Sequence, residues 1–251
     1  MPIFPANMKE DRRNSFIQKY TIRPLEADPH DRLKAGVLTD LIQQAAWTHA
    51  DKLGVGTPFM ISKGYTWVLT RLQVSITRMP VYPGEVFIET WPSGVERLFT
   101  FRHFSITDSR GDVCGQARSA WMVVDLSRKR AIKPPDFIKE IPHTIEPGNE
   151  ELYASVPDAP ADPCLSADIL VRRQDIDIND HVNNNTIIQW LYECLDRPGQ
   201  LRSLDVRFKA ECKLGDRLVS EAQIYSESAY AHRVVRPEDD REIAVARTTW
   251  H

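Results

Sequence analysis

The chain has 251 residues, of which 42% are hydrophobic and 27% charged, and 32 basic against 35 acidic residues give a formal net charge of −3. This composition is that of a globular protein and excludes a disordered, collagen-like or coiled-coil chain. A slightly acidic chain without a basic stripe is not expected to bind nucleic acid, and no apolar run is long enough to span a membrane. The length allows one large domain or two smaller ones.

The N-terminal residues and the cysteines bear on location and cofactors. The first sixteen residues, MPIFPANMKEDRRNSF, lack the apolar stretch of a secretory signal and include two acidic residues, so we expect a cytoplasmic protein. The four cysteines, at 114, 164, 194 and 212, form no C-x-x-C pair and no zinc-type spacing with histidine. We therefore expect reduced thiols, no metal site and no cofactor.

The first half of the chain predicts one strand, one helix and four further strands. A short strand is expected over 16–23, and the following helix carries an apolar stripe at helical spacing, with Leu38, Leu41, Ile42, Ala45 and Ala46. Alternating β-branched and aromatic runs then predict strands over 66–77, 85–91, 99–107 and 113–125. Arg102 is expected on an exposed strand face.

The second half repeats this order after a stretch rich in proline and acids. Seven prolines over 133–163 predict a linker. A strand is expected over 167–173, and a helix follows the asparagines at 183–185, which are good N-cap residues. Further strands are expected over 203–210, 217–226, 231–236 and 243–250.

Internal similarity indicates that the two halves are copies of one module. The segment ARSAW at 117–121 matches ARTTW at 246–250, and weaker echoes relate 72–76 to 204–208 and 40–43 to 186–189 in the same order. We therefore predict an α+β protein with an N-terminal module over 1–132, the linker over 133–163 and a C-terminal module over 164–251. Each module has an antiparallel sheet wrapped around a helix.

One polar stretch of the second module concentrates groups suited to chemistry. In an extended segment alternate side chains share a face, so Asp177, Asn179 and His181 are expected to project together. They precede the predicted helix, whose first N–H groups have no intrahelical partner and favour negative charge. An imidazole is also suited to proton transfer near neutral pH.

A polar turn that only caps a helix is the simpler interpretation of these residues. The first module argues against it. Pairing the modules at an offset of 149 places Asp28, His30 and Arg32 opposite Asp177, Asn179 and His181, and an offset of 146 places Asp31, Leu33 and Ala35 there. Neither alignment reproduces the Asn and His, although a purely structural role would be needed in both modules. The difference indicates one functional site and one vestigial site.

These residues resemble the acyl-acyl carrier protein (acyl-ACP) thioesterases, a family built from two tandem hot-dog modules. The family's D-x-D-x-N-x-H-V-N-N segment is present from Asp175 to Asn184, and its later R-x-E-C segment is represented, without the arginine, by Lys209-Ala210-Glu211-Cys212. The resemblance implies a pseudo-dimer of hot-dog modules within one chain, and an enzyme that releases free fatty acid in fatty acid biosynthesis.

The resemblance also assigns roles to residues. It places catalysis on Asp177, Asn179, His181 and Glu211, with Cys212 beside them. In our preferred scheme Glu211 is the general base toward a water ordered by Asn179. His181 assists proton transfer, Asp177 orients it, and the backbone amides of Val182 and Asn183 face the oxyanion. In a rival scheme Cys212 is a nucleophile activated by His181.

The expected partner is an acyl carrier protein bearing an acyl-phosphopantetheine. Its acidic surface fits the basic run Arg128, Lys129 and Arg130, and Arg172 and Arg173 are candidates for binding the prosthetic group's phosphate. The alternatives are an acyl-CoA thioesterase, a hot-dog dehydratase or hydratase, and a non-catalytic acyl-binding module. Because the two modules can pair within one chain, a monomer or a homodimer is expected.

Overall fold

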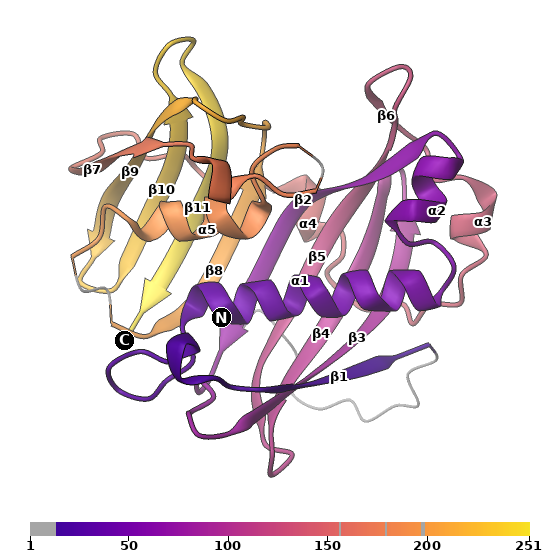
Figure 1. Ribbon diagram of the computed structural model, residues 1–251, viewed down its shortest axis with the longest axis horizontal. Helices are drawn as coiled ribbons and strands as arrows, with labels where there is room; N and C mark the ends of the chain where they lie inside the picture. The colour runs from indigo at the N-terminus through magenta and orange to yellow at the C-terminus, as the bar shows by residue number, and fades with distance from the viewer. Residues whose placement is uncertain (1–13, 156, 179, 197–198) are drawn as a thin grey trace. The chain divides into compact units, whose positions relative to one another are not determined.

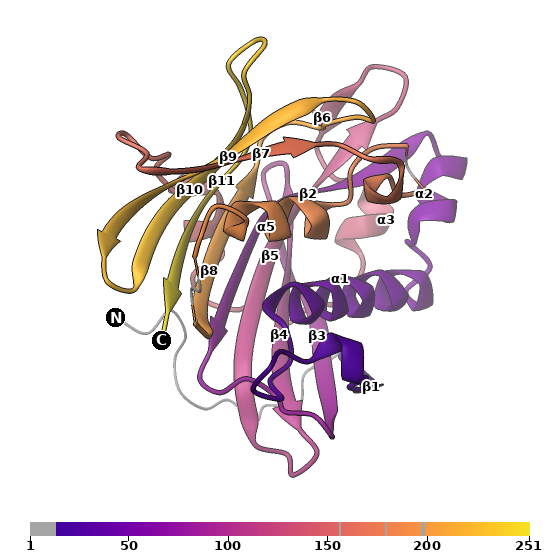
Figure 2. The same ribbon diagram turned by 60° about the vertical axis from the view of Figure 1, so that its left-hand side comes forward.

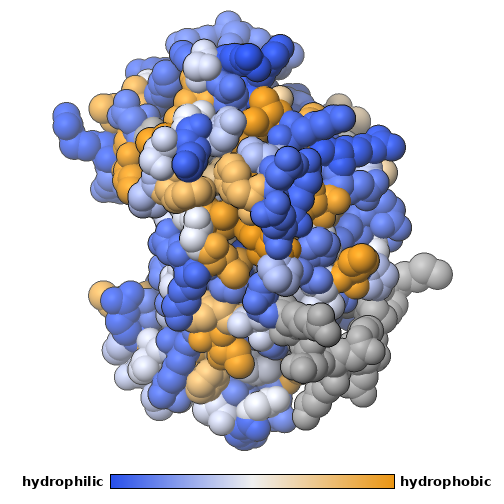
Figure 3. Space-filling view, turned by 90° about the vertical axis from the view of Figure 1, so that its right-hand side faces the viewer, coloured by the Kyte–Doolittle hydropathy of each residue, from blue (hydrophilic) through white to orange (hydrophobic). Residues whose placement is uncertain are grey.

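A computed structural model describes residues 14–155, 157–178, 180–196 and 199–251 (Figure 1). The chain folds into two compact units, of which unit 1 comprises residues 1–70 and 74–155, and unit 2 comprises residues 71–73 and 156–251. None of the helices in the described part of the chain has the length and apolar character needed to cross a membrane. The face in Figure 3 is mostly hydrophilic, with apolar side chains gathered near its middle.

Unit 1 is an antiparallel sheet with a long helix across one face. Its strands are β1 (Phe16–Thr21), β2 (Tyr65–Ile76), β3 (Glu85–Glu96), β4 (Phe99–Asp108), β5 (Val113–Asp125) and β6 (Arg130–Ile132). They follow the order β1-β3-β4-β5-β2, with β6 paired to β5. The helices are the 3₁₀ turn η1 (Pro24–Glu26), α1 (Ala35–Lys52), α2 (Thr57–Ser62), α3 (Asp136–Lys139) and α4 (Glu151–Ala154).

Helix α1 lies where its apolar stripe predicts. Figures 1 and 2 show it running across the strands of unit 1, and Leu38, Ile42 and Ala45 on its inner side are buried. Burial of such side chains contributes roughly 1.5–3 kcal/mol each and holds the helix on the sheet. The predicted helix is confirmed, and the sequence pattern alone was sufficient to find it.

The proline-rich segment after β6 packs on unit 1 instead of linking two modules freely. Ile138 of α3 is buried with Met60 and Val123, and Leu152 of α4 is buried with Phe101. Unit 1 therefore extends to Ser155, past the boundary at residue 132 that the composition predicts. The prolines concealed this because they interrupt the segment into short helices, whose isolated apolar residues give no periodic signal.

Unit 2 has the same plan with a shorter helix. It contains β7 (Leu165–Leu170), the 3₁₀ turn η2 (Arg173–Asp175), α5 (Asn184–Tyr192), β8 (Leu201–Phe208), β9 (Arg217–Ser226), β10 (Ala229–Arg236) and β11 (Arg241–Trp250). The strands form an antiparallel sheet in the order β8-β11-β10-β9-β7. Helix α5 packs on β9 and β10 and buries Ile187, Ile188 and Leu191.

Local contacts confirm that the two units are copies. The indole N–H of Trp121 donates to Ser119 Oγ at 2.8 Å, and that of Trp250 donates to Thr248 Oγ1 at 2.7 Å, two residues earlier in each case. Helices α1 and α5 begin 149 residues apart, at Ala35 and Asn184. The offset of 149 is therefore correct before and at the helices. The echo at an offset of 146 arises because a shift of three residues preserves the helical apolar stripe.

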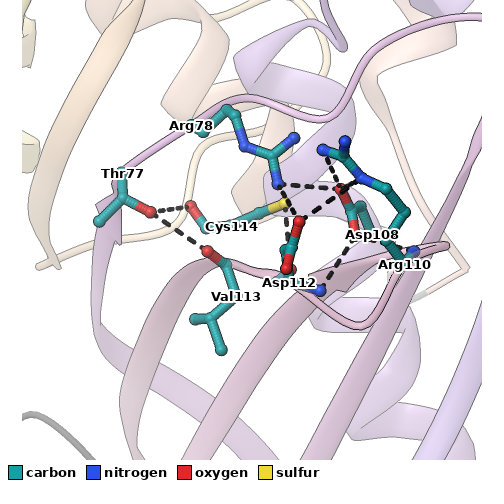
Figure 4. A network of polar contacts seen from close by, with 7 residues as sticks. All are labelled: Thr77, Arg78, Asp108, Arg110, Asp112, Val113 and Cys114. Carbon is teal, nitrogen blue, oxygen red and sulfur yellow. Dashed lines mark hydrogen bonds and ion pairs between the residues drawn. The ribbon is translucent and has the colours of Figure 1, made fainter.

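The hairpin between β4 and β5 is closed by a polar network (Figure 4). Asp108 accepts hydrogen bonds from Arg78 at 2.9 Å and from the side chain and amide of Arg110 at 3.2 and 2.9 Å. Thr77 Oγ1 donates to the carbonyl of Cys114 at 3.0 Å. These contacts hold the pKa of Asp108 at about 2, chiefly through the hydrogen bond from Arg78.

Candidate active site

The loop between β7 and α5 is shaped by its own backbone. The amide of Asp177 donates to the carbonyl of His181 at 3.0 Å, and the amide of Asp180 donates back to the carbonyl of Asp177 at 3.1 Å. Asp180 has a φ of +63°, a conformation that Asp and Asn tolerate better than most residues. The loop therefore folds back on itself and places Asp177 beside His181.

The imidazole of His181 lies between two carboxylates. Its Nδ1 is 4.0 Å from Asp177 Oδ1, and its Nε2 is 3.8 Å from Glu211 Oε1. These are ion-pair distances, longer than hydrogen bonds. The side chain of Asp177 is 18% exposed and that of Glu211 is 63% exposed, so one carboxylate is sheltered and the other faces solvent. This arrangement suits a fixed orienting group on one side and a proton-exchanging group on the other.

Glu211 reaches this loop from the segment that follows β8. The segment is extended but lies outside a strand, contrary to the strand position that the resemblance implies. Lys209 and Ala210 donate their amides to the carbonyl of Ile243, at 2.8 and 3.2 Å, and the amide of Val182 donates to the carbonyl of Cys212 at 3.1 Å. These bonds fix Glu211 against the histidine loop. The structure thus brings together three of the predicted catalytic residues, while Asn179 lies outside the described residues.

Cys212 has the properties of a buried thiol. Its side chain is fully buried, and burial, followed by the negative charge of Asp216, raises its pKa to about 12. Its carbonyl, and not its sulfur, bonds to the histidine loop. A nucleophilic cysteine needs a lowered pKa and access to the substrate, so this environment counts against the rival covalent scheme.

The amides of Val182 and Asn183, predicted to face an oxyanion, are already used. Val182 donates to Cys212 as described, and Asn183 donates to the carbonyl of Asp175 at 3.3 Å. The side chain of Asn183 is instead the N-cap of α5 and accepts from the amide of Asn185 at 2.7 Å. This prediction is therefore wrong, because the helix begins one residue later than it assumes. In the described chain, the first-turn amide that is left without a printed bond beside the loop is that of Asn184.

Unit 1 has the same loop without the catalytic groups. The amide of Asp28 donates to the carbonyl of Arg32 at 2.8 Å, and Asp31 has a φ of +61°, as at the equivalent positions 149 residues later. Arg32 stands in the place of His181 and binds Asp28 through Nε, at 2.9 Å. Leu33 donates to the carbonyl of Pro80 at 2.8 Å, the counterpart of the bond from Val182 to Cys212. Met79, buried, therefore occupies the place of Glu211.

The other predicted partner-binding residues lie on the surface. Arg172 and Arg173 are exposed at η2, beside the catalytic loop, and the amide of Arg172 is held by Asp175 Oδ2 at 2.7 Å. Arg128, Lys129 and Arg130 are exposed at the turn between β5 and β6 in unit 1. Within the described ranges, no cluster of His, Cys, Asp and Glu has the arrangement of a metal site.

Sequence reasoning missed polar groups in the space between helix and sheet in each unit. In unit 2, His232 is fully buried and its Nε2 lies 2.8 Å from Thr248 Oγ1, while burial lowers its pKa to about 4. In unit 1, Arg102 donates to His49 Nδ1 at 2.8 Å, so Arg102 is not on an exposed face as expected. Strand alternation gives the face of a residue only once the register is known, and that signal was not available for β4.

Comparisons with known proteins match this division of the chain. The family model for the acyl-ACP thioesterase N-terminal domain matches residues 13–141, and that for the C-terminal domain matches residues 160–251. The catalytic loop and Glu211 lie in the second match.

Similar proteins share this family. The acyl-[acyl-carrier-protein] hydrolase FATB1 of Cuphea viscosissima is 26% identical, with 100% of this chain and 65% of that protein covered. Oleoyl-acyl carrier protein thioesterase 1 of Arabidopsis thaliana is 26% identical, with 94% and 76% covered. The chain spans 62% of the length of a third relative, FATB3 of Cuphea viscosissima.

Solved structures show the fold. An acyl-ACP thioesterase from Bacteroides thetaiotaomicron has a TM-score of 0.82 at 26% identity, with 95% of this chain and 98% of that chain covered. A 12:0-ACP thioesterase from Umbellularia californica has a TM-score of 0.84 at 22% identity, with 95% and 97% covered, which bears on the fold alone. The α+β hot-dog fold is confirmed. With both domain models matched in order over most of its length, the chain belongs to the acyl-ACP thioesterase family.

Proposed function

We propose that the protein hydrolyses acyl thioesters of acyl carrier protein and releases the free fatty acid. The observation that supports this most directly is the position of His181 between Asp177 and Glu211, at the start of α5, within the part that matches the family's C-terminal domain. The names of the relatives support acyl-ACP as the substrate.

The residues divide the chemistry as follows. Glu211, exposed to solvent, takes a proton from a water whose oxygen attacks the thioester carbonyl. The carbonyl oxygen gains negative charge, which the amide of Asn184 and the N-terminal end of α5 stabilise. The carbon–sulfur bond then breaks, and the proton from Glu211 passes through His181 Nε2 to the departing sulfur. Asp177 holds Nδ1 and fixes the orientation of the ring. In this proposal Asn179 orders the water, as the resemblance implies.

The test is release of free thiol from acyl-ACP and acyl-CoA substrates of varied chain length. We expect turnover on acyl-ACP, with a lower kcat/KM on acyl-CoA. We expect Glu211→Gln to lower kcat by roughly 10²–10⁴-fold, with Glu238→Gln, an exposed glutamate on the β10–β11 turn, as the matched control. No thiol release from any substrate would overturn the proposal, and a higher kcat/KM on acyl-CoA would favour the CoA alternative.

Three further expectations belong with this function. Arg172 and Arg173 flank the catalytic loop and are proposed to bind the phosphate of phosphopantetheine. Replacing both with Gln should raise KM for acyl-ACP and acyl-CoA alike, since both carry that phosphate. Monomer or homodimer is proposed as the oligomeric state, which sedimentation measures. A cytoplasmic location also stays a prediction, although the named plant relatives are chloroplastic.

A further inference from the structure

One corner of unit 1 exposes apolar and basic side chains together. Helix α2, the β5–β6 turn and α3 meet there, on the side of the molecule that Figure 3 faces. We call this the basic–apolar surface. Its exposed side chains are Phe59, Ile61, Lys63, Leu126, Arg128, Lys129, Arg130 and Lys133.

Contacts between the three elements make this surface one platform. The amide of Leu126 donates to the carbonyl of Gly64, directly after α2, at 3.0 Å. The ring of Phe59 meets that of Phe137 edge-on, with centroids 5.6 Å apart. Beneath them Met60 is buried in a cluster with residues of β5 and α3. The turn and the two helices therefore present their side chains from a fixed backbone.

The turn is organised so that its cations point to solvent without a neutralising acid. Asp125 Oδ1 accepts from the amides of Ser127 and Arg128, both at 2.9 Å, and from Ser127 Oγ at 2.7 Å, so this carboxylate is occupied by the turn itself. Lys129 has a φ of +51°, which places it at the tip. The nearby Asp136 binds Lys139 at 2.8 Å.

The five cations of the surface thus keep their charge available. Within the part of the chain that the structure describes, Lys63, Arg128, Lys129, Arg130 and Lys133 have no recorded ion pair with a carboxylate. This is a local excess of positive charge on a chain whose net charge is −3. Such a patch attracts and orients an acidic partner over several ångströms, and salt weakens the attraction.

The apolar side chains restrict the kind of partner. Ile61 is 53% exposed, Leu126 43% and Phe59 38%. Single exposed apolar residues are common, but three on adjoining elements inside a basic rim are typical of a protein-binding surface. A free phosphate would use the cations alone. A helix with acidic residues beside an apolar stripe satisfies both parts of the surface.

We propose that the basic–apolar surface is the docking site for an acidic helix of the acyl carrier protein. The proposal rests on the proposed function and adds the place and chemistry of recognition. The cations guide and hold the carboxylates of the partner, and Ile61, Leu126 and Phe59 contact its apolar side chains. Recognition of the carrier is thereby placed in unit 1, on residues distinct from the catalytic loop of unit 2.

The test compares charge reversal at this surface with the same change elsewhere. Arg128→Glu/Arg130→Glu should raise KM for acyl-ACP on the order of tenfold and leave kcat unchanged. The increase should shrink in high salt. Its kcat/KM for acyl-CoA should equal that of the unmodified protein. The control, Arg202→Glu/Arg241→Glu, changes the charge equally at two exposed residues of unit 2 and should leave KM for acyl-ACP unchanged.

A second pair of variants tests the apolar part, and direct binding separates the outcomes. Ile61→Ser/Leu126→Ser should weaken binding of holo-ACP to the immobilised protein at all salt concentrations. An unchanged KM and unchanged ACP binding in both pairs would overturn the proposal, as would loss of binding to anionic phospholipid vesicles alone, which would assign the surface to a membrane. If Arg128→Glu/Arg130→Glu melts early, Arg128→Gln/Lys129→Gln replaces it. Failure of the proposed function is distinct, because then no variant hydrolyses any thioester.

Discussion

Whether Cys212 takes part in catalysis is decided by its environment, and Cys212→Ala tests it. The thiol is fully buried, and its pKa is raised to about 12. At pH 7 such a thiol is deprotonated to about one part in 10⁵, whereas a free cysteine with a pKa near 8.5 is deprotonated to about 3%. The thiolate that a covalent scheme needs is therefore roughly 3,000-fold scarcer than in an exposed cysteine.

Two measurements follow from this magnitude. Cys212→Ala should hydrolyse acyl-ACP with kcat/KM within about threefold of the unmodified protein, because the loss of a small buried side chain affects stability more than chemistry. Alkylation by iodoacetamide at pH 7, followed by mass spectrometry, should modify the exposed Cys164 long before Cys212.

The result that refutes this reasoning is equally specific. A folded Cys212→Ala protein that loses more than about a hundredfold in kcat, or an acyl group trapped on Cys212 during turnover, would establish the covalent scheme. Thermal melting of the variant separates a loss of folding from a loss of chemistry. A matched Cys194→Ala variant, at a partly buried thiol on the α5 side of unit 2, reports what a cysteine deletion alone does.

Three further predictions concern stability. Asp108→Asn should remove stabilisation that is present above pH 4 and is lost as pH falls toward 2, since the folded pKa of Asp108 is about 2 against an ordinary 3.8. The acid-unfolding curves of the two proteins should therefore converge near pH 2, and curves that stay parallel would contradict the assignment. Leu152→Ala should destabilise unit 1 by about 3 kcal/mol in urea unfolding, because Leu152 is buried with Phe101; an effect below about 0.5 kcal/mol would mean that this segment does not pack on the sheet. Asn183→Ala should cost about 1 kcal/mol through loss of the N-cap of α5, while Asn183→Asp, which keeps the capping oxygen, should cost less in the same thermal melts.

The local features of the fold were accessible from sequence because they depend on neighbouring residues. The apolar stripe of α1 and the alternation of the strands state which side of each element is buried. The match between 117–121 and 246–250 identified equivalent strands, and the structure shows the same Trp to hydroxyl bond in both. The segment after β6 was misjudged, because the burial of Ile138 and Leu152 depends on a sheet face that no local pattern reveals.

The candidate site was only partly predictable for the same reason. Alternation placed Asp177 and His181 together, since they lie four residues apart in one loop. The sequence by itself thus determined the modules, the loop and the type of chemistry that its side chains support. Tertiary structure decided three things that depend on distant contacts. It set Glu211 3.8 Å from His181, it gave the amides of Val182 and Asn183 to other carbonyls, and it buried Cys212. Burial and hydrogen-bond partners arise from segments far apart in the chain, and those are what turn a reactive residue type into a base, a proton carrier or an inert thiol.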